Sequence, residues 1–566
     1  MLKKLLLTLF LLSTQILLVV YLLGATPLII KTDKINTPVI SKSSNYTGLL
    51  IPLDSRPPCK EFTQNLAKIA GINLTVPPKY LLDDYRTPAQ SNALRQWLYN
   101  SIASSPDFAI LSTDMLMHGG LIASRDVHSL EGREQTFIEL LEILKSKSPN
   151  TSLAAFTIIP RLLISENDDT KTWQYHMMQY AILKDKVNTF ENPLDFQELQ
   201  KIQLRLPEKL VNKYNNIYLT NDSFNKNLFK AIQNDLVQKI IVGQDDGEVF
   251  GLPNTNRHKA ELYLEHLNSN QKTNAYTTRG ADEIAQLFIA QYTNEIYSTS
   301  PKIYIQYSDA QTKNKIMPYM PSSVDETARE KIKIIKGNVV NDKNTADFIL
   351  FIHCGDQKNS DFFSLTKISQ NLNELLASNK NIALVDLSEN FEAQETLLDS
   401  LIKNNVPLSK LIAYAGWNTT SNSIGTAVSQ ASIFTARKKH LPVSEHLQLY
   451  YLNSNFTLSR IIEDWGYLKI ILPQTNKNLK LFGIDNYKLN SNKHYTESLI
   501  QNKVQFLANN LLYQNFSRYP FYQLENTCFF FNSVKTTVNL PWDRTFEINL
   551  KLETTISKTN NSNAKK

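Results

Sequence analysis

Cysteine is scarce in this chain, with three among 566 residues. Cys59, Cys354 and Cys528 lie far apart and in no metal-ligand spacing. A disulfide framework is therefore excluded, although a single bridge stays open, and no cysteine-based metal centre is predicted.

Several chemistry-bearing motifs are also missing. No P-loop, GxGxxG or GxSxG pattern occurs, so nothing favours nucleotide binding or a serine hydrolase. Neither an HxH nor an HExxH pattern occurs, and the chain has nine histidines in all. We therefore expect no cofactor and no dedicated metal site.

A strong charge of one sign is absent as well. The formal net charge of +7 is small for this length, and the lysines are scattered, so we predict no nucleic-acid partner. A hydrophobic share of 42% and a charged share of 20% are typical of a globular protein. The length suffices for two or three domains, and the oligomeric state is left open.

The N-terminus carries the clearest targeting signal. Lys3 and Lys4 precede an apolar run from Leu5 to about Ala25. This run exceeds the roughly 7–15 residues of a signal-peptide core and approaches the ~20 residues that span a bilayer. We predict an anchor over residues 1–26, with the remainder outside the cell membrane. A cleaved signal peptide and a secreted protein are the alternative.

Apolar strand-like runs alternate with helical patterns over residues 48–438. This alternation predicts an α/β domain, and runs that are apolar throughout are typical of strands buried on both faces of a parallel sheet. We expect a (β/α)8-type barrel, with an open doubly wound parallel sheet as the alternative. The strand-like runs cover residues 48–53, 107–113, 152–159, 239–244, 302–308, 347–353, 381–387 and 410–416.

The flanking segments differ in character from this domain. Residues 27–47 are polar and predict a linker. Residues 439–556 are first helical and then β-rich, which predicts a smaller C-terminal α+β domain. Residues 557–566 predict a frayed tail.

Active sites of parallel α/β folds form at the carboxyl ends of the strands, so the residues that follow each run are the candidates. The segment "KIIVGQDDGEVFGLP" places Asp245, Asp246 and Glu248 directly after such a run. Asp282, Asp356 and Asp386 are interpreted as helix caps or loop polar groups. The predicted substrate-binding set is Asp54, Arg56, Asp114, His118, Arg125, Gln244, Arg279, Tyr307, Trp417 and Asn418.

Two adjacent carboxylates favour acid chemistry. The charge of one raises the pKa of the other, which keeps that acid protonated near neutral pH. Such an acid can protonate the leaving oxygen of a glycosidic bond. We assign Asp246 as the general acid and Asp245 as its orienting partner, and Glu248 as a competitor for the acid role.

The position of the pair after the fourth predicted strand resembles that in β-N-acetylhexosaminidase-type barrels. This resemblance implies that the acetamido group of the substrate is the nucleophile and that Asp245 orients it. Trp417, with Tyr307 or Tyr414, would supply an aromatic platform, and Asn418 and Arg56 would bind hydroxyl groups. The expected partner is therefore an amino-sugar glycan or another small polar substrate.

Six motifs together resemble a bacterial family catalogued only as a domain of unknown function. They are "LDSRPP", "DMLMHGGLIASR", "QDDGE", "RGADE", "AGWNT" and "PWDRTFE", and the resemblance spans roughly residues 48 to 550. It implies no reaction. It does imply that Trp542, Arg544 and Glu547 belong with the other motif residues.

Two further functions stay open beside the glycoside hydrolase. A metal-dependent hydrolase could hold a hard cation through Asp54, Asp114, His118, Asp245 and Asp246. A non-catalytic surface protein could bind a glycan in the same cleft.

Overall fold

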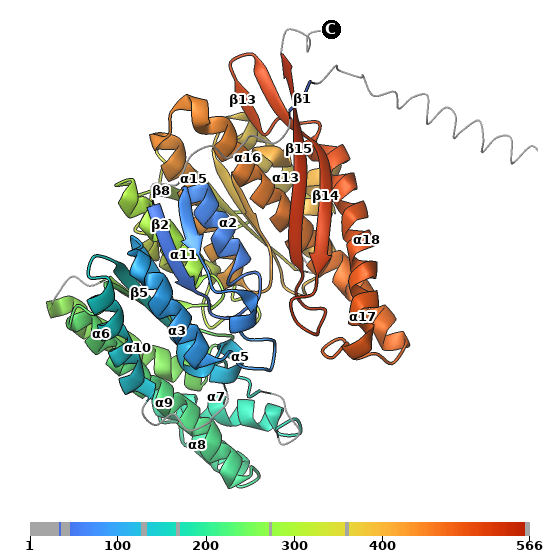
Figure 1. Ribbon diagram of the computed structural model, residues 1–566. Helices are drawn as coiled ribbons and strands as arrows, with labels where there is room; N and C mark the ends of the chain where they lie inside the picture. The colour runs from blue at the N-terminus through green and yellow to red at the C-terminus, as the bar shows by residue number, and fades with distance from the viewer. Residues whose placement is uncertain are drawn as a thin grey trace, which may run out of the picture.

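The computed structural model describes residues 33–35, 46–125, 133–165, 170–270, 274–356 and 362–560. Within them, two parallel sheets and one antiparallel sheet are surrounded by helices (Figure 1). The predicted α/β class is confirmed. The predicted barrel is not, because neither parallel sheet closes on itself.

The first parallel sheet has six strands in the order β3-β2-β4-β5-β6-β7. Its strands β4, β5 and β6 are apolar and almost wholly buried, as expected for strands covered on both faces. The bounds are β2 (Tyr46–Ile51), β3 (Ile72–Thr75), β4 (Phe108–Ser112), β5 (Ser152–Ile159), β6 (Lys239–Gln244) and β7 (Ala275–Arg279).

The second parallel sheet has five strands in the order β12-β11-β10-β8-β9. Its bounds are β8 (Lys302–Tyr307), β9 (Asn338–Val339), β10 (Phe348–Gly355), β11 (Ile382–Ser388) and β12 (Ala413–Ala415). A barrel requires the last strand to pair with the first, and here β7 and β3 remain edges of their sheet. A strand buried on both faces looks the same in sequence whether its sheet is open or closed, so the pattern could not separate the two.

Three helices pack between the sheets and join them. They are α2 (Glu61–Ala70), α11 (Ile284–Ile296) and α15 (Thr420–His440), which contact one another. Every residue of α11 from Ile284 to Asn294 is buried. One hydrophobic cluster runs through these helices and both sheets, so the two sheets share a core.

Other helices cover the outer faces and the strand ends. Those of the first half are α3 (Ser91–Ser101), α4 (Thr113–His118), α5 (Leu121–Ser124) and α6 (Arg133–Lys147). Those of the second sheet are α12 (Val324–Ile334), α13 (Phe362–Ala377) and α14 (Leu398–Lys403). Four more, inserted around β6, form one end of the molecule in Figure 1: α7 (Gln174–Phe190), α8 (Pro193–Gln203), α9 (Glu208–Gln233) and α10 (Leu252–Asn270).

The C-terminal part consists of helices and an antiparallel sheet. The helices are α16 (Val443–Arg460), a π-helical segment Ile461–Ile471, α17 (Leu472–Leu481) and α18 (Lys493–Leu511). The sheet order is β1-β15-β14-β13. Its bounds are β1 (Asp33–Ile35), β13 (Tyr522–Leu524), β14 (Thr527–Asn539) and β15 (Asn549–Asn560).

Two boundaries differ from the predicted ones. β1 lies inside the predicted linker and pairs antiparallel with β15, while β15 extends four residues beyond 556 into the predicted tail. Short polar segments carry little strand signal, and here pairing with a distant strand creates the structure.

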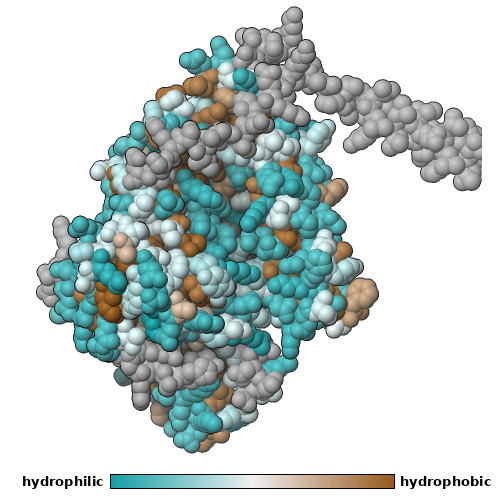
Figure 2. All heavy atoms as spheres, viewed as in Figure 1, coloured by the Kyte–Doolittle hydropathy of each residue, from teal (hydrophilic) through white to brown (hydrophobic). Residues whose placement is uncertain are grey.

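No helix among the described residues is both long and apolar enough to span a bilayer. The anchor predicted over residues 1–26 lies outside the described residues. Figure 2 shows apolar side chains scattered over a largely hydrophilic face of the molecule.

Candidate active site

A cavity of about 520 Å³ lies beyond the carboxyl ends of the strands of the first sheet, where they face the C-terminal part. Its wall combines acids, cations and aromatic rings. The acids are Asp245, Asp246 and Asp282; the cations are Arg56, Arg125, Arg161, Lys469 and Arg544; the aromatic residues are Tyr319, Phe391, Tyr487, Trp542 and Phe546. This volume is within the roughly 300–1,000 Å³ of small-molecule sites.

Asp245 is held firmly at the end of β6. Its amide donates to the carbonyl of Ile159 on β5 at 3.1 Å, which extends the sheet by one residue. Its carboxylate accepts the amide of Asp246 at 2.9 Å and pairs with the guanidinium of Arg125. Asp245 is therefore a fixed negative charge at the cavity wall.

Asp246 differs from its neighbour although the two are adjacent. Among the described residues its carboxyl group has no hydrogen-bond partner, and it lines the cavity. Burial and the charge of Asp245 raise the pKa of Asp246 to about 7, against the opposing effect of Arg125 and Arg161. A substantial share of Asp246 is therefore protonated near neutral pH and can donate a proton into the cavity.

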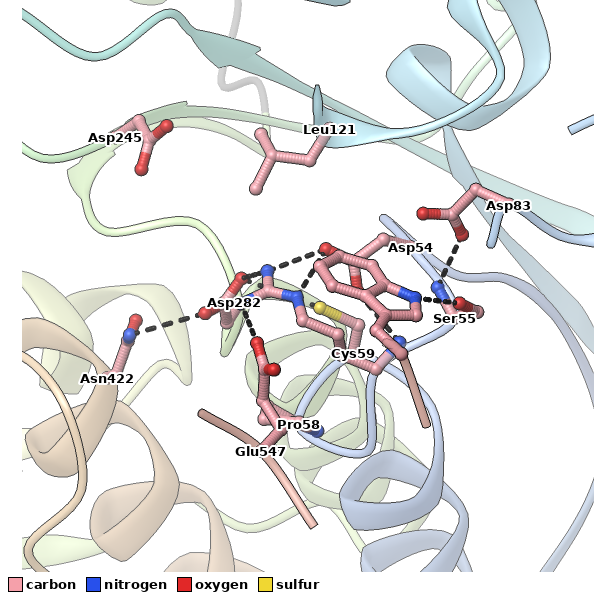
Figure 3. Close-up of polar contacts among 12 residues, drawn as sticks. Asp54, Ser55, Pro58, Cys59, Asp83, Leu121, Asp245, Asp282, Asn422 and Glu547 are labelled. Carbon is pink, nitrogen blue, oxygen red and sulfur yellow. Dashed lines mark hydrogen bonds and ion pairs between the residues drawn. The ribbon is translucent and has the colours of Figure 1, made fainter. Parts of the chain in front are cut away.

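Arg56 contacts three acids from segments that are remote in sequence, Asp54, Asp282 and Glu547, which Figure 3 shows grouped together. It donates to Asp54 through Nε at 2.9 Å and through Nη2 at 2.6 Å, and Nη2 also donates to Asp282 at 2.6 Å. Its Nη1 lies 3.5 Å from Glu547, near the start of β15. Burial raises the pKa of Asp282 to about 6, and the charge of Arg56 opposes this rise.

The same cluster bears on the metal-dependent alternative. Within the described part of the chain, the group with metal-ligand geometry is Asp54, Cys59 and Asp282, which is not the set expected from the sequence. Nη2 of Arg56 donates to both carboxylates of this group at 2.6 Å. The guanidinium thus already supplies the positive charge that a cation would bring.

The segment before β15 closes one side of the cavity. Nε1 of Trp542 donates to Oγ of Ser55 at 2.8 Å, and Arg544 pairs with Glu547. The guanidinium of Arg544 lies 4.7 Å from the centre of the Trp542 ring. The structure therefore gathers Trp542, Arg544 and Glu547 with Arg56, as the motif resemblance implied.

The predicted aromatic platform lies elsewhere. Trp417 is 3% exposed and packs edge-on against Phe62 in the core. The hydroxyl of Tyr307 donates to Asp325 at 2.5 Å, and Tyr414 is fully buried. None of the three lines the cavity, whereas Asn418, next to Trp417, does.

Other predicted residues stand behind the cavity wall or away from it. Asp114 accepts the amide of Ile158 at 3.0 Å, and burial raises its pKa to about 7. Gln244 donates to Asn254 at 2.7 Å, and Arg279 pairs with Glu330. Glu248 is exposed to solvent, and His118 ends α4; neither lines the cavity.

Sequence reasoning missed part of this wall. Asp282 was interpreted as a cap, yet it binds Arg56, 226 positions earlier in the chain. Arg161 follows β5 and Lys469 lies in the π-helical segment, and neither belongs to the set predicted from the sequence. Asp386 by contrast accepts the amides of Leu397 and Leu398 at the start of α14, which is the role expected of a cap.

The chain matches a family model described as "Protein of unknown function (DUF4127)" over residues 48–551. No curated protein and no solved structure matches the chain.

Proposed function

We propose that this chain, which belongs to the DUF4127 family of proteins of unknown function, is an exported glycoside hydrolase that acts on amino-sugar-containing glycans. The observation that carries the proposal is Asp246, an unpartnered carboxyl group at the cavity wall with a pKa raised to about 7. Cleavage of a glycosidic bond requires such an acid near the scissile oxygen.

In the proposed reaction Asp246 gives its proton to the glycosidic oxygen while the bond from that oxygen to the anomeric carbon breaks. The carbonyl oxygen of the substrate's acetamido group attacks the same carbon and forms a cyclic oxazolinium. Asp246, now ionised, then accepts a proton from the water that opens this ring, so the acid is restored. Glu248, which is exposed to solvent, has no part in this scheme.

Asp245 has two tasks in this scheme. Its fixed charge raises the pKa of Asp246, and its carboxylate would accept the acetamido N–H of the substrate. One oxygen of Asp245 already accepts from the amide of Asp246 and the other from Arg125. Each carboxylate oxygen has a second lone pair, so a further hydrogen bond is chemically available.

Sugar rings would be held by the aromatic and amide groups of the wall. Tyr319 and Tyr487 are about half exposed and offer ring faces, which pack against the apolar faces of sugars. Oδ1 of Asn422 is buried without a hydrogen-bond partner, and Asn418 lines the same cavity. These groups suit hydroxyl recognition because a buried unpaired acceptor gains a full hydrogen bond from a ligand.

The test is a hydrolysis screen of the purified extracytoplasmic part against aryl N-acetylhexosaminides of both anomeric configurations and against amino-sugar oligomers. We expect hydrolysis whose kcat/KM falls above about pH 7, because Asp246 loses its proton there. A chelator should leave the rate unchanged. Binding of oligomers without hydrolysis would replace the proposal with the non-catalytic glycan-binding alternative, and restoration of a chelated enzyme by a divalent ion would replace it with the metal-dependent one.

A further inference from the structure

The cations of the cavity wall are not equivalent. Arg56 pairs with Asp54 and Asp282, Arg125 with Asp245, and Arg544 with Glu547. Two other cations of the wall, Arg161 and Lys469, have no carboxylate within 4.0 Å among the described residues. Lys469 is buried and donates to the hydroxyl of Ser388 at 3.0 Å, which leaves Arg161 as the one of the two whose charged end has no side-chain partner in the described structure. A partly buried cation without a counter-ion is costly unless a ligand supplies the charge.

The loop that carries Arg161 is fixed in place. The amide of Leu162 donates to the carbonyl of Asp246 at 3.0 Å, which ties this loop to the proposed acid. The hydroxyl of Tyr218 donates to the carbonyl of Arg161 at 2.9 Å, and that of Tyr214 to Leu162 at 2.6 Å. Both tyrosines lie on α9 and are buried, so the helical insertion holds the loop.

The side chain of Arg161 is oriented as well. Its Nε donates to the carbonyl of Leu163 at 3.0 Å, which leaves the two terminal nitrogens without a partner among the described residues. Nε of Arg125, in the same wall, is also buried without a partner. These free donors match the oxygens of a carboxylate or a phosphate, which arginine binds through two parallel hydrogen bonds.

We propose that Arg161, supported by Arg125, binds an anionic substituent on the sugar that lies next to Asp246. This inference rests on the proposed function and narrows its substrate class to acidic amino-sugar glycans, in which the sugar carries a carboxylate or a phosphate. The electrostatics agree with the geometry: the charge of Arg125 and burial lower the pKa of Arg161 to about 10, and a bound anion would relieve this crowding of like charges.

The experiment compares sugars that differ only in the acidic group. The probes are the methyl glycosides of N-acetylglucosamine, N-acetylmuramic acid and N-acetylglucosamine 6-phosphate, with Kd measured by calorimetry on the Asp246→Asn variant so that no hydrolysis interferes. We expect at least one acidic sugar to bind about 10- to 100-fold more tightly than the neutral sugar, as charge-assisted hydrogen bonds imply. Tighter binding of the N-acetylmuramic acid probe identifies a carboxylate as the anionic group, and tighter binding of the 6-phosphate probe identifies a phosphate.

Variants of the arginine complete the test. In an Asp246→Asn background, Arg161→Met should abolish the preference for the acidic sugar, and Arg161→Lys should keep part of it. Arg205→Met removes the same charge from an exposed position after α8 and should change nothing. The inference is overturned if neither acidic sugar binds more tightly than the neutral one, or if a folded Arg161→Met variant keeps the preference. If the preference depends on Arg161 while the wild type hydrolyses no glycan, the anion site stands and the hydrolase proposal fails.

Discussion

Replacement of Arg56 by methionine tests whether the cluster around this residue holds the chain together. Arg56 is 6% exposed and contacts carboxylates of Asp54, Asp282 and Glu547, which come from three separate segments. Methionine fills a similar volume but leaves these carboxylates buried and facing one another. Loss of one partner from a buried ion pair typically costs about 3–5 kcal/mol, and we expect a loss of this size in the free energy of unfolding.

The loss should depend on pH with a definite sign. In the wild type the pKa of Asp282 is already about 6, and without the guanidinium the carboxyl groups must become still harder to ionise. The carboxyl groups of the variant can take up protons at low pH, which relieves their repulsion. The loss in its free energy of unfolding relative to the wild type should therefore be largest near about pH 8 and smaller near about pH 5.

Urea unfolding of the wild type, Arg56→Met and Arg56→Lys at both pH values measures these quantities. Arg56→Lys keeps the positive charge but loses the planar guanidinium that donates to two carboxylates at once. Its free energy of unfolding should therefore lie between those of the wild type and Arg56→Met. Arg329→Met serves as the control, since Arg329 forms a half-exposed pair with Asp325 and should contribute at most ~1 kcal/mol. A deficit for Arg56→Met no larger than that of the control, or one that does not vary with pH, would refute the reasoning.

Three further predictions address the wall, the buried acids and the location. Gly280 has φ +92° and a Cβ there would meet Glu283 and Ser421, so Gly280→Ala should lower Tm more than Gly483→Ala, where φ is +68° and nothing lies within 4 Å; equal effects in thermal unfolding would contradict this. The raised pKa of Asp114, about 7 when folded against about 4 when unfolded, means that its contribution to stability is lost as pH rises through this window. The decrease in Tm from about pH 5 to about pH 8 should therefore be smaller in Asp114→Asn than in the wild type. An equal decrease in both proteins would contradict this prediction. Protease added to cells whose wall has been removed should digest the chain beyond residue 48; full protection would reject the predicted location.

The sequence could predict which residues follow the strands, but not which side chains from other segments contact those residues. Asp245 and Asp246 were found because they directly follow an apolar run, and carboxyl ends of parallel strands face a common edge. Asp282 follows a strand in the same way, yet its partner Arg56 belongs to a loop after a different strand. Such pairs are decided by the order of strands in the sheet, which local pattern does not encode.

The direction in which a side chain points could not be predicted from the sequence either. Trp417 and Asn418 are adjacent, and the structure sends the tryptophan into the core against Phe62 while Asn418 faces the cavity. Asn418 has φ 50°, so the chain turns sharply between them. The short β3, "INLT", was missed because it is half polar and lies at an edge, where a strand needs little hydrophobicity.

The assignment of Asp246 as general acid is tested most directly by the leaving-group dependence of hydrolysis. Wild type, Asp246→Asn and Asp245→Asn are compared on two N-acetylhexosaminides of one sugar, one with a nitrophenyl and one with a poor alkyl leaving group. Loss of a general acid costs about 10²–10⁴-fold in rate, and a good leaving group needs less protonation. We predict a large loss for Asp246→Asn on the alkyl glycoside and a much smaller one on the nitrophenyl glycoside, with similar losses on both for Asp245→Asn. Equal losses on both substrates in a folded Asp246→Asn variant would contradict the assignment.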